Sequence, residues 1–224
     1  MTPPHNITLY ATDNRIDPDA IDCLIDGLED RGIDDIPGVI TEKRLAERFA
    51  DAYCARKGLA WQIVMNQRIH ELTAVHPDIP KIGRIRLLDE KDMHFFPYWA
   101  EAFYAAGTYG KTDMNIPQEA GPYLYRIASK KIYVLEDGGI PVSMAGFTRE
   151  LPTAIGVAFV YTPPYFRGRG YATSIVAQIS RLALDRGYRR CVLYTDLANP
   201  VSNSIYRKIG YVPVCDSLQI HFVR

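Results

Sequence analysis

The stretch of sequence that decides the fold is VYTPPYFRGRGYA, from Val160 to Ala172. An apolar strand pattern over residues 154–162 leads into it, and apolar residues at helical spacing follow over about 170–186. The proline-rich and glycine-rich segment between these two patterns is typical of a tight loop. The sequence therefore predicts a strand, a short loop and a long helix, in that order.

The loop has the composition of an anion-binding site. Gly168 and Gly170 let the main chain approach a ligand closely, where a Cβ atom would obstruct it. Arg167 and Arg169 add positive charge, and the N-terminal end of a helix favours a bound anion. A phosphate or diphosphate is the natural ligand, although the spacing fits neither GxxxxGK nor GxGxxG. The alternative is a simple strand-to-helix turn with solvated arginines.

Helices and strands alternate through the rest of the chain. Helices are expected over about 18–28, 41–57, 90–106, 170–186 and 201–209, with a short one starting at Pro117, and strands over 7–10, 61–65, 68–75, 83–87, 131–136, 140–149, 154–162, 190–195 and 211–222. Asp17 and Gly58 are start and stop signals for the first two helices. Asp137-Gly138-Gly139 is a hairpin turn. This order of elements predicts a mixed α/β sheet.

The composition excludes several classes of protein. Of the 224 residues, 47% are hydrophobic, and 26 Lys and Arg balance 26 Asp and Glu, which indicates a globular chain without net charge. A nucleic-acid binder needs a basic surplus, and a membrane span needs about 20 consecutive apolar residues, so neither partner is expected. The N-terminal sequence does not resemble a signal peptide. The four scattered cysteines have no CxxC spacing. We therefore expect a cytoplasmic protein without a metal site.

A second informative stretch is NPVSNSIYRKIGY, from Asn199 to Tyr211. Over about 84–224 the chain resembles the GCN5-related N-acetyltransferase (GNAT) superfamily. The acetyl-coenzyme A loop of that family, Arg/Gln-x-x-Gly-x-Gly/Ala, is matched by Arg167, Gly170 and Ala172. The family's downstream signature, Asn-x-x-Ser/Ala-x-x-x-Tyr-x-Lys-x-Gly-Phe/Tyr, is matched by Asn199, Ser202, Tyr206, Lys208, Gly210 and Tyr211.

The resemblance implies a fold and a cofactor-binding site. The expected fold is α/β (α+β), with a mixed, mostly antiparallel sheet flanked by helices, and the expected acyl donor is acetyl-coenzyme A. The strand before the loop would separate from its neighbour and pair with the amides of pantetheine around Val160, Tyr161 and Thr162. The diphosphate would be held by Arg167, Gly168, Arg169, Gly170, Tyr171, Ala172 and Thr173. Asn199 and Asn203 would reach the pantetheine arm or order the loop.

The resemblance also implies a catalytic residue, Tyr206. Its phenol would donate a proton to the departing thiolate, since a tyrosine with a pKa near 10 is protonated at neutral pH. A neutral amine would attack the thioester directly while a backbone N–H polarises its oxygen. The alternatives are that Tyr206 packs with Ile205 and Ile209, and that Asn199 only caps the helix that follows it.

The general base is not identified by the sequence. The strand before the loop carries no glutamate, which leaves Glu150 and Glu101 as candidates beside a base acting through water or an amine that is already neutral. The acceptor pocket is expected to be lined by residues 99–109 and by the segment around Tyr123 and Tyr125. Its aromatic content suggests an apolar or cationic acceptor.

Residues 1–82 are expected to form an N-terminal α/β extension, and residues 83–224 the acetyltransferase domain. Helix followed by strands in the extension is reminiscent of a degenerate GNAT-like half. The extension has no glycine loop, so we expect it to be inactive, and a simple packing extension is the alternative.

The resemblance implies an acetyl-coenzyme A-dependent N-acetyltransferase that acts on a primary amine of a small molecule or peptide, in a family where homodimers are common. Direct transfer needs no metal. The alternatives are a non-catalytic acyl-coenzyme A sensor and a generic anion-binding domain.

Overall fold

The computed structural model describes residues 6–11, 16–106 and 120–224. The helix expected to start at Pro117 and the last part of the 99–109 segment lie at least partly outside these described residues. Two compact units divide the chain. The first unit consists of Met1–Ile69, Thr195–Ala198 and Val214–Arg224, and the second consists of His70–Tyr194 and Asn199–Pro213. The predicted boundary between residues 82 and 83 divides the sequence differently, and it stays a prediction.

The first unit contains two helices and a small number of paired strands. It contains β1 (Ile7–Thr8), α1 (Pro18–Glu29), β2 (Gly38–Glu42), α2 (Lys43–Lys57) and most of β3 (Ala60–Leu72) and β9 (Val212–Val223). β2 pairs with β1 in parallel and with β9 in antiparallel orientation. Its core contains Ile25, Val39, Phe49, Tyr53 and Ile220, all at most 1% exposed.

The helix boundaries of this unit follow from local chemistry. The Asp17 carboxylate accepts the Asp19 N–H at 3.1 Å, and Pro18 occupies the first helical position of α1. Gly58 ends α2 with φ +64°, a left-handed conformation that favours glycine. These start and stop signals are confirmed.

The strand prediction over residues 61–75 of this unit is confirmed as far as Leu72 but wrong in its break, and one strand, β2, was not predicted. Strands over 61–65 and 68–75 were expected to join at Asn66 and Gln67, but β3 runs without a break from Ala60 to Leu72. A two-residue hairpin turn needs positive φ, which neither residue adopts. β2 was not predicted as a strand, because its apolar run is too short to show a period, and the helix expected from about residue 41 overlaps its end.

The second unit contains a mixed, mostly antiparallel sheet flanked by helices. Its elements are β4 (Arg84–Leu87), the 3₁₀ turn η1 (Glu90–His94), α3 (Phe96–Ala106), α4 (Ala120–Ala128), β5 (Ile132–Asp137), β6 (Ile140–Glu150), β7 (Ala154–Tyr161), the 3₁₀ turn η2 (Pro164–Phe166), α5 (Tyr171–Asp185), β8 (Arg190–Asp196) and α6 (Pro200–Ile209). The strand order is β8-β7-β6-β5-β4, with only β7 and β8 parallel. The predicted fold class is confirmed.

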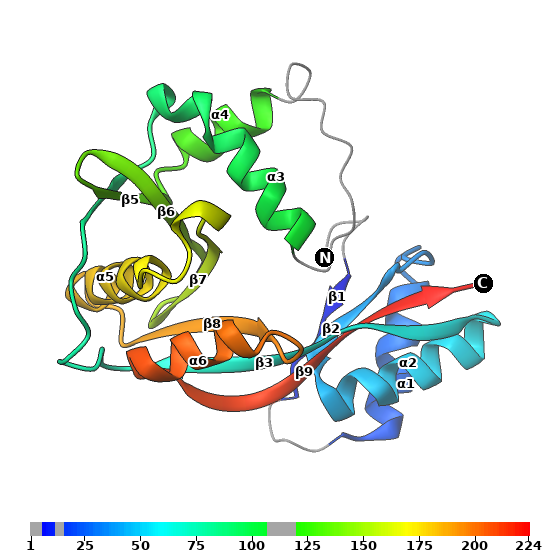
Figure 1. The fold of residues 1–224 in the computed structure, drawn as a ribbon. Helices are drawn as coiled ribbons and strands as arrows, with labels where there is room; N and C mark the ends of the chain where they lie inside the picture. The colour runs from blue at the N-terminus through cyan, green and yellow to red at the C-terminus, as the bar shows by residue number, and fades with distance from the viewer. Residues whose placement is uncertain (1–5, 12–15, 107–119) are drawn as a thin grey trace. The chain divides into compact units, whose positions relative to one another are not determined.

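Helices cover both faces of this sheet, with α5 on one face and α3 and α4 on the other (Figure 1). The side chains of β5 alternate between these two faces, which explains why both are covered. Tyr133 and Leu135 pack into the core under α5, while Ile132 and Val134 pack into the core under α3 and α4. A strand buried on both faces reads as a continuous apolar run, as β5 does.

The predicted β5–β6 hairpin is confirmed, with φ +57° at Gly138 and +79° at Gly139. In the described ranges, no helix is long and apolar enough to cross a bilayer.

Candidate active site

The glycine loop connects β7 to α5 in the second unit. Gly168 has φ +76° and Gly170 has φ +81°, so both adopt the left-handed conformation that L side chains rarely take. A Cβ atom on Gly168 would point into open space, whereas one on Gly170 would lie 3.2 Å from Ile82 Cδ1. The loop therefore presents a bare main-chain surface at Gly168.

The N-terminus of α5 has no side-chain cap among the described residues. Gly170 occupies its N-cap position. The first helical hydrogen bond is that of the Ser174 N–H to the Gly170 carbonyl, at 2.9 Å. The N–H groups of Tyr171, Ala172 and Thr173 precede it, and such groups have no partner inside a helix. They are the donors that a diphosphate can use.

Two arginines flank this N-terminus and are exposed. The Arg167 Nε donates to the Thr162 carbonyl at 3.0 Å, which ties this side chain to the end of β7. The Arg169 guanidinium lies 5.3 Å from the centroid of the Tyr165 ring. Both positive charges therefore stay close to the loop.

The start of α5 is fixed by side-chain hydrogen bonds. The Tyr171 hydroxyl donates to Asp137 Oδ2 at 2.6 Å, and this bond raises the pKa of Tyr171. Ser174 Oγ accepts the Ile82 N–H at 2.9 Å and donates to the Ile82 carbonyl at 2.8 Å. Neighbouring segments thus hold the helix N-terminus in place.

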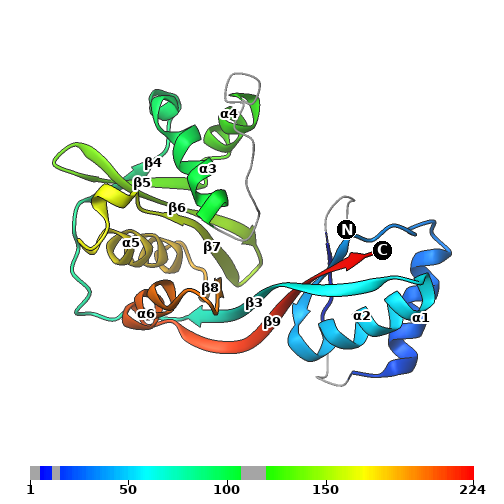
Figure 2. The same ribbon diagram turned by 45° about the vertical axis from the view of Figure 1, so that its right-hand side comes forward.

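β7 parts from β8 before it reaches the loop. The parallel pairing covers only Ala154–Gly156 against residues 190–192. Figure 2 shows the two strands diverging beyond this paired stretch. The strand separation expected before the loop is confirmed, and it leaves an open strand edge over residues 157–161. Val160 and Tyr161 lie on this edge, and Thr162 follows it.

A bulge in β7 was not predicted. Phe159 has φ +58°, and the pairing with β6 shifts register between Met144 and Gly146. Val157 packs under α5, whereas Phe159 and Tyr161 pack on the α3 and α4 face. A strand without a bulge would put all three odd-numbered residues on one face. No sequence signal marks this position, since a phenylalanine rarely adopts positive φ.

Tyr206 lies in α6, which packs against α5. The residue is 8% exposed, and burial raises its pKa to about 12. Its ring lies edge-on to the Tyr211 ring at a centroid distance of 5.9 Å. Tyr206 shares one apolar core with Tyr171, the first residue of α5.

Asn199 caps α6, as the alternative reading of this residue expected. Its Oδ1 accepts the Ser202 N–H at 3.1 Å, and its carbonyl accepts from Asn203 Nδ2 at 2.8 Å. The two asparagines therefore order the first turn of α6, and their contact with a ligand stays a prediction.

The two candidate bases have different surroundings. Glu101 is buried in α3, where its Oε1 accepts a short hydrogen bond from the Tyr123 hydroxyl. Glu150 is exposed at the end of β6 and pairs with Lys131 at 3.0 Å. A catalytic role for either carboxylate stays a prediction.

Aromatic residues of α3 face the end of β7. The Trp99 and Tyr161 rings lie 6.2 Å apart, and the Phe103 and Phe159 rings stack at 5.0 Å. Ser143 Oγ donates to the Tyr161 carbonyl at 2.9 Å and holds the strand end from the other side. Of the segment expected to line the acceptor site, Trp99 and Phe103 lie at this strand end.

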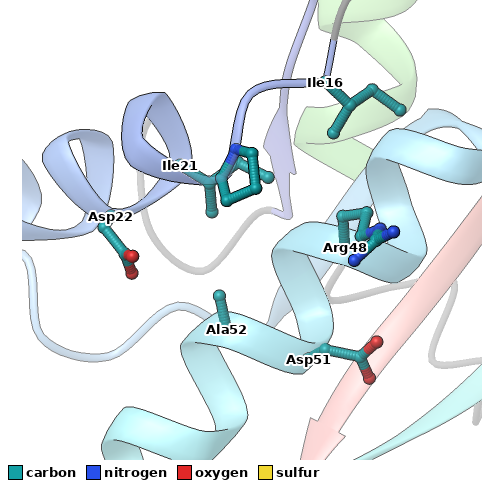
Figure 3. Close-up of a pocket in the computed structure, with 7 residues that line it drawn as sticks. Ile16, Ile21, Asp22, Arg48, Asp51 and Ala52 are labelled. Carbon is teal, nitrogen blue, oxygen red and sulfur yellow. The ribbon is translucent and has the colours of Figure 1, made fainter.

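A separate hollow of about 170 Å³ lies between α1 and α2 of the first unit (Figure 3). It is lined by Ile16, Pro18, Ile21, Asp22, Arg48, Asp51 and Ala52, none of which is a predicted site residue. Among the residues with assigned positions, no three His, Cys, Asp or Glu side chains gather as a metal site would require.

Comparison with known proteins agrees with this fold. The model of the acetyltransferase (GNAT) family matches residues 93–211. A GCN5-related N-acetyltransferase from Kribbella flavida is similar in structure, with a TM-score of 0.61 and 16% identity over 92% of this chain and 76% of that one. An acetyltransferase of the GNAT family from Colwellia psychrerythraea has a TM-score of 0.58 and 13% identity over 92% of this chain and 71% of that one. Among curated proteins, no sequence matches.

Proposed function

Since this chain belongs to the acetyltransferase (GNAT) family, whose model spans more than half of it, we propose that it transfers an acetyl group from acetyl-coenzyme A to a primary amine of a small molecule or peptide. The single observation that supports this most strongly is the uncapped N-terminus of α5, placed directly after the open edge of β7.

The donor site fits the two chemically distinct parts of coenzyme A. The diphosphate would accept hydrogen bonds from the main chain between Gly168 and Thr173, where a Cβ atom at Gly168 would fill the space it needs. The pantetheine amides would pair with the backbone of residues 157–161 as an added strand does. Arg167 and Arg169 would balance part of the negative charge.

Tyr206 would serve as the proton donor. Its raised pKa of about 12 keeps the phenol protonated across the physiological range, so the hydroxyl can always donate to a developing thiolate. Burial disfavours a thiolate as well as a phenolate, so it raises the pKa of the departing thiol together with that of the phenol. The attacking amine would lose its proton to water, to Glu101 or to Glu150.

A thiol-release assay across a panel of amines tests this proposal. We expect the wild-type protein to release coenzyme A with at least one amine, and Tyr206→Phe to lose most of its turnover while it still binds coenzyme A in calorimetry. Binding of acetyl-coenzyme A without transfer to any amine would indicate a sensor instead. A thermal shift with inorganic phosphate equal to that with acetyl-coenzyme A would indicate a generic anion-binding domain.

A further inference from the structure

We propose that Arg126 binds a carboxylate of the acceptor, so that the acceptor is an amine that also carries a carboxylate, such as an amino acid or a peptide terminus. This inference rests on the proposed function and names its substrate class. It replaces the apolar or cationic acceptor that the aromatic content of the sequence suggested.

Arg126 is held in a cluster of aromatic side chains. Its guanidinium carbon lies 4.6 Å from the centroid of the Phe159 ring and 5.6 Å from that of the Tyr104 ring. One of its Nη atoms donates to the Tyr104 hydroxyl at 2.5 Å. Phe159 in turn stacks on Phe103. These contacts fix the guanidinium plane, which lowers the entropy lost when it binds a planar carboxylate.

The charge of Arg126 is unbalanced in the described part of the chain. The side chain is partly buried, yet within residues 6–11, 16–106 and 120–224 it makes no ion pair with Asp or Glu. By contrast, the partly buried Arg86 pairs with both Asp92 and Glu136. A partly desolvated cation without a counter-ion favours a bound anion.

The position of the cluster connects this cation to the reaction. The diphosphate would sit on the loop after β7, so the pantetheine arm must run from there back along the open edge over residues 157–161. The thioester therefore lies near the bulge at Phe159. Strained backbone concentrates at functional sites, and φ +58° at Phe159 is such a strain. The ring of this residue carries the Arg126 guanidinium, on the face that α3 and α4 cover.

Arg186 serves as a control for the possibility that Arg126 has only a structural role. Arg186 makes the same type of contact on the α5 face, where it donates to the Tyr133 hydroxyl at 2.8 Å and lies over the Tyr133 and Phe147 rings. Arg186 is exposed, so water solvates its charge, and it has no place in the proposed site. Loss of packing alone would affect both variants.

The experiment compares three acceptors that share one carbon skeleton: an amino acid, its carboxamide and its decarboxylated amine. We expect the wild-type protein to prefer the amino acid. Arg126→Met should lower kcat/KM for the amino acid by roughly tenfold or more, the range of a charge-assisted hydrogen bond, and change that for the carboxamide less than threefold. Arg126→Lys should keep part of the preference. Arg186→Met should leave all three ratios unchanged.

The outcomes separate this inference from the proposed function. Equal losses on all three acceptors in Arg126→Met, or a wild-type preference for the decarboxylated amine, would overturn the carboxylate site while the acetyltransferase function stands. If none of the amines tested gave release of coenzyme A, the proposed function itself would be overturned. Thermal unfolding of each variant shows whether it is folded. If Arg126→Met does not fold, Arg126→Lys still tests the carboxylate site.

Discussion

The Tyr171 hydroxyl donates to Asp137 Oδ2 at 2.6 Å and so joins the first residue of α5 to the β5–β6 hairpin. Tyr171 is 8% exposed, and its backbone N–H is among those that would meet the diphosphate. A bond between side chains far apart in the sequence thus sets the direction of the proposed anion site.

Removing this bond should weaken both the fold and donor binding. We expect Asp137→Ala and Tyr171→Phe each to lower the free energy of unfolding, because each variant lacks one partner of a hydrogen bond to a charged acceptor. The affinity for coenzyme A should fall several-fold as the start of α5 loosens. Urea unfolding and calorimetry of both variants and the double variant measure this. Strictly additive effects in the double variant would show that the two side chains do not interact.

Gly168→Ala should separate backbone strain from ligand exclusion. Alanine at φ +76° should cost about 1 kcal/mol of stability, and its methyl group would occupy the space of the diphosphate. Gly32→Ala is the matched control, since Gly32 has φ +67° and open space around it in the first unit. We expect both variants to lose similar stability in urea unfolding, but only Gly168→Ala to lose affinity for coenzyme A, by at least tenfold. If Gly168→Ala and Gly32→Ala bound coenzyme A with equal affinity, the diphosphate would lie elsewhere.

Tyr206→Phe should change the pH dependence of stability. Burial raises the pKa of Tyr206 to about 12, so the folded state retains a proton that the unfolded state loses near pH 10. The stability that this protonated, buried phenol contributes is complete below pH 10 and declines between about pH 10 and 12. At pH 11 the decline should be about 1.4 kcal/mol relative to pH 8.

Urea unfolding between pH 8 and pH 11 checks this, with Tyr206→Phe showing a decline smaller by that amount. Tyr188→Phe, a change at a partly buried tyrosine in the same core, controls for general effects of the substitution. In turnover assays Tyr206→Phe should lower kcat by about 100-fold or more, the range of a general acid. A kcat within threefold of wild type would remove Tyr206 from the mechanism.

Phe159 should invert the usual ranking of alanine and glycine in a strand. Glycine normally destabilises a strand by about 0.5–1 kcal/mol relative to alanine. At φ +58° alanine keeps the backbone strain and glycine relieves it, so Phe159→Gly should unfold at higher urea than Phe159→Ala. Val157, a regular position of the same strand, should show the normal order. The same order at both positions would mean that the bulge relaxes once the ring is removed.

The sequence predicted those features that depend on local chemistry. Asp17 and Gly58 delimit helices because capping and left-handed φ are properties of single residues. The β7–loop–α5 unit was predicted because apolar periods of two and of 3.6 residues meet at a glycine-rich loop. The cap at Asn199 was visible for the same reason, since Pro200 follows it.

Features that depend on tertiary contacts were not predictable. The bulge at Phe159 turns its ring into the core under α3 and α4, and neither that residue nor its neighbours signals positive φ. The place of Arg126 beside Phe159 is likewise set by segments distant in the sequence. β3 was divided at Asn66 because a polar pair in a strand resembles a turn when its sheet neighbours are unknown.

A crystal structure with acetyl-coenzyme A bound tests the central claim most directly. We predict diphosphate oxygens within hydrogen-bonding distance of the main-chain N–H groups between Gly168 and Thr173, and the thioester sulfur within reach of the Tyr206 hydroxyl. A diphosphate bound away from the α5 N-terminus, or a Tyr206 hydroxyl directed away from the sulfur, would contradict the account.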